Sequence, residues 1–191
     1  MSSDSISALL NAYVTVFDEE KLYHKLALEL VRQHPDDCWQ RSLLTGHFTG
    51  SAWVLSPDGA QALLIHHRNL DKWVQPGGHA DDTDASLAET ARREAVEECG
   101  LSGLTLLSEE IFDLDIHVIP AKRDIPEHLH YDVRFLFQAE NEALSADFSE
   151  VKAVKWVALE SIVVSSLPSL GHLQQSVRRM AVKSLTRHDG Q

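Results

Sequence analysis

Glu94, Glu97 and Glu98 are spaced i, i+3 and i+4 along the chain. In a helix of 3.6 residues per turn their three carboxylates project from one side. Like charges at this spacing weaken a helix by roughly 0.2–0.5 kcal/mol per pair. A bound divalent cation would relieve that repulsion, and a solvated acidic helix face is the alternative interpretation of the same pattern.

The predicted helix positions these carboxylates beside apolar residues. Its apolar stripe consists of Leu87, Ala91, Ala95 and Cys99. The glutamates lie along one edge of this stripe, so we expect them to be half sheltered, where an unpaired charge is costly. Arg93 stands four residues from both Glu89 and Glu97 and can orient one of them. Pro76-Gly77-Gly78 precedes the helix, and Gly100 closes it.

The end of this stretch resembles the signature of the Nudix hydrolase family, G-x5-E-x7-R-E-U-x-E-E-x-G-U, in which U is a bulky aliphatic residue. The matching segment reads Arg93-Glu94-Ala95-Val96-Glu97-Glu98-Cys99-Gly100-Leu101. Ala95 is the one residue smaller than expected. The second half of the signature is therefore closely matched.

The first half of the signature departs from the family spacing. Counting back from Arg93, the signature glycine falls on His79 and its first glutamate on Ala85. Gly78 and Asp84 look like the equivalents, with one residue inserted either between Asp84 and Arg93 or in the loop before Ala85. An inserted loop residue costs little free energy. The loop Gly-Gly-His-Ala-Asp resembles that of one Nudix subgroup.

The resemblance covers about residues 46–163 and implies a fold, an α/β/α sandwich with a mixed β-sheet. It also implies hydrolysis of a diphosphate linkage in a nucleoside diphosphate derivative with Mg²⁺ or Mn²⁺, whose preferred ligands are hard oxygens. By match to the motif, the metal ligands are Glu94 and Glu98 first, then Glu97 and the Gly77 carbonyl. Arg93 would orient a carboxylate. The general base is left open among Glu97, Glu98 and Glu150.

Two alternatives share this fold. The first is a noncatalytic regulatory or binding protein, which would be expected to have lost acidic residues from the signature. The second is an enzyme like isopentenyl diphosphate isomerase, which needs cysteine and glutamate chemistry. Cys38 and Cys99 do not occupy convincing positions for it, and Cys99 fits core packing better.

Composition limits the class of protein. The chain has 191 residues, 43% hydrophobic and 24% charged, and a formal net charge of −12. This charge argues against general nucleic-acid binding, which needs cationic side chains. No segment has the apolar length of a membrane span, the first residues do not resemble a signal peptide, and two cysteines are too few for a disulfide framework. We expect a cytoplasmic protein that acts on a small molecule.

Two amphipathic helices are predicted before the family-like region. The first starts near Ile6, with Ser3, Asp4 and Ser5 available as caps, and the second is capped by Asp18 and ends before Pro35. We interpret residues 1–40 as a helical extension packed on a Nudix hydrolase domain of residues 41–191. The extension could instead serve a homodimer or gate the site. Another amphipathic helix is predicted from Pro168 onward.

The strands are predicted from alternation and turn signals. Residues 47–55 and 60–65 flank the turn Ser56-Pro57-Asp58-Gly59, a hairpin pattern. Shorter strands are expected around Trp73, at 104–107, 111–119 and 151–157, with an acidic loop at 141–150 and a helix start at 159–162. Residues 128–137 form a further strand.

One face of that last strand carries polar side chains: His128, His130, Asp132 and Arg134. A His-x-His-x-Asp strand could bind zinc with further ligands from elsewhere, whereas a solvent-facing polar strand is the commoner explanation. Asp132 and Arg134 could also face the substrate. Arg68 and Lys72 are further candidates for binding phosphates, and Trp73 for binding a base or for the core.

Overall fold

The computed structural model describes residues 1–122, 124–163, 176–177 and 180. Its helices and strands are, in chain order, α1 (Ser3–Ala12), α2 (Asp18–Gln33), β1 (Gly46–Leu55), β2 (Gln61–His67), β3 (Lys72–Val74), β4 (Gly77–His79), α3 (Leu87–Cys99), β5 (Leu104–Leu106), β6 (Asp113–Ile119), β7 (His128–Ala139), β8 (Val151–Ala158) and α4 (Leu159–Val163). Contacts divide the chain into two compact units. Unit 1 is Met1–Ala52, Gly77–Glu94 and Ser108–Phe135, and unit 2 is Trp53–Pro76, Ala95–Leu107 and Leu136–Gln191.

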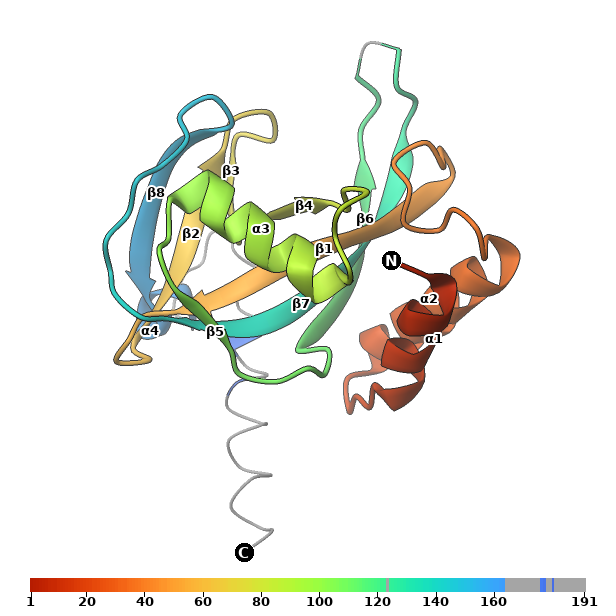
Figure 1. Cartoon of the computed structure of the whole chain (residues 1–191), viewed down its shortest axis with the longest axis horizontal. Helices are drawn as coiled ribbons and strands as arrows, with labels where there is room; N and C mark the ends of the chain where they lie inside the picture. Colours follow the sequence, from red (N-terminus) through yellow and green to blue (C-terminus); the bar gives the residue numbers. More distant parts are fainter. Residues whose placement is uncertain (123, 164–175, 178–179, 181–191) are drawn as a thin grey trace, which may run out of the picture. The chain divides into compact units, whose positions relative to one another are not determined.

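Unit 1 is built on two antiparallel strand pairs. The short strand β4 pairs with the first half of β1, which places Thr49 opposite His79. Strand β6 pairs with the first half of β7, which places His117 opposite His130. Helices α1 and α2 lie side by side (Figure 1), and α2 contacts β6. Helix α2 therefore packs on the strand that borders the polar part of β7.

Unit 2 is centred on β2, which pairs antiparallel with both β3 and β8. The end of β1 joins this group because Leu55 pairs with Ala62. Strand β5 pairs with the last residues of β7, and α4 contacts β8. The core side chains here are mainly aliphatic, as in the buried run Ala62 to Ile65.

The eight described strands are connected by hydrogen bonds in the order β3-β2-β1-β7-β5, with β4 on β1, β6 on β7 and β8 on β2. The long strand β7 changes partner along its length. It pairs with β6 from His128 to Arg134 and with β5 from Phe137 to Ala139. The polar part of β7 is thus matched by β6, and its apolar end by β5.

The predicted hairpin is confirmed. Strands β1 and β2 flank the expected turn, in which the Ser56 hydroxyl and the Ala60 N–H both donate hydrogen bonds to the Asp58 carboxylate, at 2.6 and 3.0 Å. Strand β4 was not predicted. It consists of Gly77, Gly78 and His79, which carry no strand propensity of their own, and it forms because β1 supplies a partner for its backbone.

The helix caps differ from the prediction. Ser2 caps α1 and forms a reciprocal capping box with Ser5, where Ser3, Asp4 and Ser5 were expected as caps. The N-cap of α2 is Phe17, and Asp18 is the first helical residue, where its charge still suits the helix dipole. The end of α2 before Pro35 is confirmed. The helix predicted from Pro168 lies largely outside the described residues.

No helix within the described ranges combines the length and the apolar character needed to cross a membrane.

Candidate functional site

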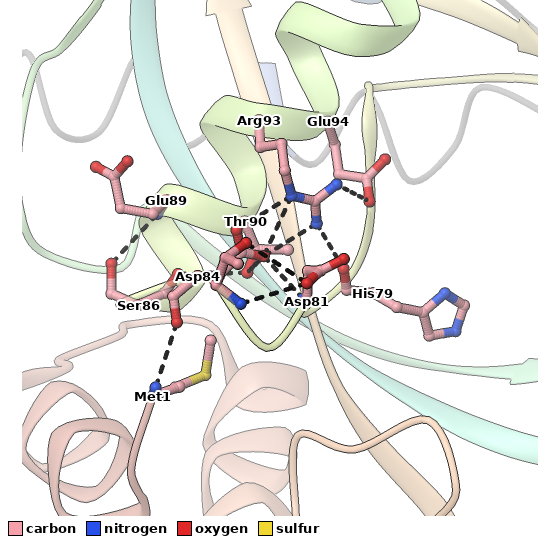
Figure 2. A network of polar contacts seen from close by, with 10 residues as sticks. Met1, His79, Asp81, Asp84, Ser86, Glu89, Thr90, Arg93 and Glu94 are labelled. Atoms are coloured by element: carbon pink, nitrogen blue, oxygen red, sulfur yellow. Dashed lines mark hydrogen bonds and ion pairs between the residues drawn. The ribbon is translucent and has the colours of Figure 1, made fainter.

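The loop between β4 and α3 is held by Arg93. Its guanidinium binds both carboxylate oxygens of Asp84, with Nε 3.1 Å from Oδ1 and Nη2 3.0 Å from Oδ2. It also donates to the His79 carbonyl at 2.9 Å and to Glu94 Oε1 at 3.0 Å. Figure 2 shows this network, with the imidazole of His79 pointing away from it. One arginine thus joins the loop to the helix that carries the glutamates.

Asp84 is well suited to pair with Arg93. Its carboxylate also accepts hydrogen bonds from the Thr90 hydroxyl and the Asp81 N–H, both at 2.9 Å. Burial alone would raise the pKa of Asp84, but the hydrogen bonds from Arg93, Asp81 and Thr90 together hold that pKa below its usual value. The helical spacing predicted that Arg93 would orient either Glu89 or Glu97. The structure shows Arg93 bound to Asp84 and Glu94, and Glu89 forms an ion pair with Arg92. Orientation of Glu97 by Arg93 stays a prediction.

The start of α3 explains why the helix begins where it does. The Ser86 hydroxyl accepts a hydrogen bond from the Glu89 N–H at 3.2 Å, which caps the helix. The predicted apolar stripe is confirmed, since Leu87, Ala91, Ala95 and Cys99 are all buried. This packing fixes the rotation of α3, and with it the side on which the glutamates project.

Gly78 leaves room for a carboxylate. A Cβ atom at this position would lie 2.5 Å from Oε1 of Glu94. At Gly77 a Cβ would lie 2.2 Å from the Ser51 hydroxyl oxygen. The two glycines therefore let the β4 backbone approach both β1 and Glu94, as a carbonyl that serves a metal site must. Gly77 was the glycine predicted to supply such a carbonyl.

Glu98 is the most buried of the three signature glutamates. Glu98 is only 3% exposed, whereas Glu94 is half-buried and Glu97 is exposed. In unit 2, carboxylate oxygens of Glu98 and Glu150 lie within 4.8 Å of each other. Glu94 lies one turn before Glu98 on α3. Glu98 and Glu150 are 52 positions apart in the sequence and are thus neighbours in the structure.

The acidic loop that carries Glu150 is docked on the end of α3. The Asp147 N–H donates to the Glu98 carbonyl at 3.2 Å, and the Ser145 N–H donates to the Cys99 carbonyl at 2.9 Å. Gly100 adopts a left-handed conformation with φ +66°, which ends the helix and lets Ser145 approach. The loop therefore satisfies carbonyl groups that the helix end leaves open.

Arg68 holds the same loop from the other side. Its side-chain Nη2 donates to the Phe148 carbonyl at 2.6 Å and to the Val151 carbonyl at 3.3 Å. The backbone N–H of Arg68 donates to the Glu150 carbonyl at 3.2 Å. Arg68 was predicted as a candidate for binding phosphates, and in the structure it also holds the backbone that carries Glu150. Lys72 is exposed at the start of β3.

Trp73 was predicted either to lie in the core or to bind a base, and in the structure it is half-buried. Its ring stacks on that of His66 with centroids 5.1 Å apart, and the Lys155 ammonium lies 4.0 Å from the Trp73 centroid. Trp73 therefore has cationic and aromatic neighbours within unit 2.

The polar face of β7 is buried, so its interpretation as a solvent-facing strand is wrong. Asp132 is 2% exposed and Arg134 1% exposed. Arg134 forms ion pairs with Asp113, Asp115 and Asp132, with N–O distances of 3.0, 3.0 and 2.9 Å. Burial alone would lower the pKa of Arg134, but the three carboxylates raise it above its usual value. In this structure Asp132 and Arg134 therefore serve the fold, and a contact of either with the substrate stays a prediction.

Hydroxyl groups of β1 complete this buried cluster. Thr49 and Ser51 donate hydrogen bonds to Asp132 Oδ1, at 3.0 and 2.7 Å. Alternate residues of one strand share a face, so His47 belongs to the same face as Thr49 and Ser51. The polar side of β7 is thus matched by a polar side of β1.

A histidine cluster was missed by the sequence analysis. Ring nitrogens of His47, His79 and His130 lie within 4.8 Å of one another. Burial, followed by the neighbouring histidines, lowers the pKa of His79 to about 3 and that of His130 to about 2. The zinc hypothesis had named His128, His130 and Asp132, but the structure groups His130 with residues of two other strands. Only the His-x-His spacing of β7 gave any signal in the sequence.

Comparisons with known proteins identify the family and the fold. The model of the NUDIX domain matches residues 47–177 of the chain. The crystal structure of a C. elegans Ap4A hydrolase binary complex is similar with a TM-score of 0.55 and 18% identity, over 73% of this chain and 98% of that chain. The MutT NUDIX hydrolase from Burkholderia pseudomallei gives a TM-score of 0.53 and 17% identity, over 70% of this chain and 97% of that chain.

A third similar structure is the NUDIX domain of Shewanella oneidensis NrtR complexed with ADP ribose. Its TM-score is 0.51 at 18% identity, over 78% of this chain and 97% of that chain. None of the curated proteins searched matches the chain significantly. At these identities the structural likeness concerns the fold, and it confirms the predicted mixed β-sheet with helices. Because the domain model covers more than half of the sequence, the chain belongs to the Nudix family.

Proposed function

We propose that this Nudix hydrolase cleaves a diphosphate linkage in a nucleoside diphosphate derivative and that it does so with Mg²⁺ or Mn²⁺. The observation that carries the proposal is the approach of Glu98 and Glu150 to within 4.8 Å, with Glu98 only 3% exposed. Two carboxylates so close, one of them buried, repel each other unless a cation or a proton compensates. The pyrophosphate chemistry of the family gives a reason for the cation.

The donor atoms fit a hard divalent metal. Carboxylates offer acceptor oxygens, which Mg²⁺ and Mn²⁺ prefer over nitrogen or sulfur. Nudix hydrolases generally use divalent metals. In this chain Glu94 and Glu98 would hold the metal first, and Glu97 and the Gly77 carbonyl next. Bound metal would supply neutralisation of the phosphate charge and orientation of the attacking water.

The remaining residues position these ligands. Arg93 fixes Glu94 through its 3.0 Å hydrogen bond and fixes the loop through Asp84. Arg68 and the end of α3 fix Glu150 through backbone contacts. Because the Glu94 side chain and the backbone of Glu150 are held by the fold before substrate arrives, little reorganisation of these two groups is needed during the reaction.

Hydrolysis requires a base near the attacking water. The water oxygen forms a bond to phosphorus, one P–O bond of the diphosphate breaks, and a carboxylate takes the proton of the water. Glu97, Glu98 and Glu150 are the candidates for this base. Glu97 is exposed, whereas Glu98 is buried beside Glu150.

The substrate class is supported by two similar structures. One is described as an Ap4A hydrolase complex and the other as an NrtR domain complexed with ADP ribose. Ap4A, after which the first protein is named, and ADP ribose, which is bound to the second, both contain a nucleoside joined to phosphoanhydride groups. At 18% identity neither decides between the two ligands, so the proposal for this chain extends to the class and leaves the individual substrate open.

The cysteine chemistry of an isomerase has no support in the structure. Cys38 and Cys99 are both buried and unbridged. Burial raises the pKa of Cys38 to about 11 and also raises that of Cys99. Such thiols stay protonated near neutral pH and react poorly. The noncatalytic alternative is disfavoured because the acidic side chains of the signature are retained. A homodimer and a cytoplasmic location stay predictions.

A substrate panel tests the proposal. The phosphorylated products should be separated and measured by chromatography after incubation with ADP-ribose, diadenosine polyphosphates, nucleoside triphosphates and isopentenyl diphosphate, with and without Mg²⁺. We expect metal-dependent turnover of one nucleoside diphosphate derivative and its loss in Glu98→Gln. Wild-type turnover in that variant would contradict the assignment of Glu98, and no turnover of any substrate would favour the noncatalytic alternative.

A further inference from the structure

The histidine cluster of unit 1 brings together side chains from three strands. His47 comes from β1, His79 from β4 and His130 from β7. One ring nitrogen of each lies within 4.8 Å of the others. The ring centroids are 5.0 Å apart for His47 and His79, 5.0 Å for His47 and His130, and 4.9 Å for His79 and His130. Three imidazoles thus point their nitrogens at one small volume.

His47 is prepared to act as a ligand. Its Nδ1 lies 3.1 Å from the Leu43 carbonyl oxygen, and a carbonyl can only accept, so Nδ1 carries the proton. The lone pair of the neutral ring is then on Nε2. Within the described part of the chain this Nε2 is buried and has no hydrogen-bond partner. A buried nitrogen without a partner is unfavourable unless something binds to it.

His79 and His130 have the separation expected of two ligands. Their Nε2 atoms are 3.2 Å apart. Two nitrogens bound to one tetrahedral Zn²⁺ at about 2.0–2.1 Å would be about 3.3 Å apart. A hydrogen bond between the two rings also fits this distance, but it leaves the Nε2 of His47 without a partner. Binding of one cation accounts for all three nitrogens.

We propose that His47, His79 and His130 bind one Zn²⁺ ion, with the fourth coordination position open to water or a small anion. Neutral imidazole nitrogens suit Zn²⁺, Co²⁺ and related ions, whereas Mg²⁺ and Mn²⁺ prefer oxygen. This site is separate in its donor atoms from the carboxylates of the proposed hydrolase site. It does not depend on the proposed function, because its test measures metal and not hydrolysis.

The backbone around the ligands is already fixed. The His79 carbonyl accepts a hydrogen bond from Arg93, and the strand register places His79 opposite Thr49 of β1. His117 faces His130 across β6 and β7, and its Nδ1 lies 3.2 Å from Asp115. A metal at this place would join β4 to β1 and β7. It would thereby anchor the three-residue strand that leads into the Arg93 loop.

Metal binding to the full chain tests the site directly. Protein stripped with a chelator should be titrated with Zn²⁺ by calorimetry, and its metal content measured by mass spectrometry. We expect about one Zn²⁺ per chain. In His79→Asn and His130→Asn the affinity should fall more than about 100-fold, since even a lost outer partner of a ligand costs about 10–100-fold.

Two control variants separate the cluster from other histidines and from the carboxylates. His34→Asn changes a histidine that pairs with Asp37 outside the cluster, and Glu98→Gln changes the proposed Mg²⁺ site. Both should bind Zn²⁺ like the wild-type chain. An equal loss of affinity in His34→Asn, or in Glu98→Gln, would overturn the assignment. Circular dichroism shows whether each variant is folded.

Cobalt gives a measurement on the unmodified chain if the variants do not fold. Co²⁺ bound by three imidazoles and one further ligand should show the intense visible bands of a four-coordinate ion, and Zn²⁺ should displace it. Weak bands of a six-coordinate, oxygen-bound ion, or no bound Co²⁺, would refute the site. Failure of this test leaves the Mg²⁺-dependent hydrolysis unaffected.

Discussion

The histidine cluster of unit 1 and the signature carboxylates differ in how the fold assembles them. Glu94, Glu97 and Glu98 are neighbours on one helix, so their spacing in the sequence already places them on one side. His47, His79 and His130 come from three strands, and only the pairing of those strands brings them together. The first group consists of anionic oxygen donors and the second of neutral nitrogen donors. A motif therefore reveals the first kind of site, and a structure is needed for the second.

Removing Arg134 should have the largest effect, because Arg134 is buried and neutralises three aspartates. Arg134→Met leaves Asp113, Asp115 and Asp132 without their cation. We expect the free energy of unfolding to fall by about 3–5 kcal/mol, the usual cost of breaking a buried ion pair. Urea denaturation measures this.

The matched control is Arg32→Met on α2. Arg32 pairs with Glu29 at the surface, where the two side chains are 70% and 44% exposed. Exposed pairs contribute only about 0–1 kcal/mol, so this variant should be close to wild type. Equal destabilisation by both changes would show that burial does not distinguish the two arginines.

Glu98→Gln should separate the two groups of ligands. Loss of the buried carboxylate should reduce Mg²⁺-dependent hydrolysis by at least about 100-fold, or about 2.7 kcal/mol of transition-state stabilisation. Zn²⁺ binding by the histidines should be unchanged. Glu110→Gln, at an exposed position, is the control for removal of one negative charge, and it should keep full activity.

The pH dependence of stability should come from the histidines of the metal-free chain. The pKa of His79 is lowered from 6.5 to about 3 and that of His130 to about 2 by burial and by the neighbouring histidines. Below about pH 6.5 the unfolded chain binds protons that the folded chain does not. The contribution of these two histidines to the free energy of unfolding is therefore fully present above this pH and decreases below it. We expect a loss of about 1.4 kcal/mol per histidine between about pH 7.5 and about pH 5.5.

Other charged or titratable groups also act on the rings of His79 and His130, so a control histidine outside the cluster is needed. His47, His128 and Arg41 act electrostatically on His79, and His117, which lies beside Asp115, faces His130. His79→Asn should reduce the slope of stability against pH, measured by urea denaturation in chelator, and His34→Asn should not. An unchanged slope in His79→Asn would mean that the ring of His79 is not kept neutral by the fold.

Arg93→Lys should weaken the proposed metal site without removing one of its proposed ligands. Lysine keeps the charge but cannot form the forked hydrogen bonds that Arg93 makes to Asp84. Because Arg93 positions the glutamates rather than binding the metal, we expect about 10–100-fold weaker apparent Mg²⁺ affinity. The Mg²⁺ dependence of hydrolysis measures this, and an unaltered dependence would show that Arg93 does not orient the ligands.

The sequence predicted the elements whose signals are local. The hairpin of β1 and β2 and the apolar stripe of α3 follow from alternation, turn residues and helical spacing. Strand β4 was missed because a Gly-Gly-His segment has no propensity for a strand. It forms through pairing with β1, which is information held by distant residues.

The site was predictable to the same extent. The acidic residues of α3 could be named because their spacing and the following glycine match a family motif. The burial of Asp132 and Arg134 could not be predicted, because alternation shows that residues share a face and not which side that face occupies. The pairing of β6 with β7 is what places Asp113 and Asp115 beside Arg134 and Asp132.

The pairing of Asp84 with Arg93 has a consequence for the evolution of the signature. The loop carboxylate lies one position away from the family spacing, yet its two oxygens still reach the guanidinium. Selection can therefore act on the contact rather than on the number of residues between its partners. A search for this chain's motif that fixes the spacing would therefore miss Asp84, although Asp84 makes the contact with Arg93.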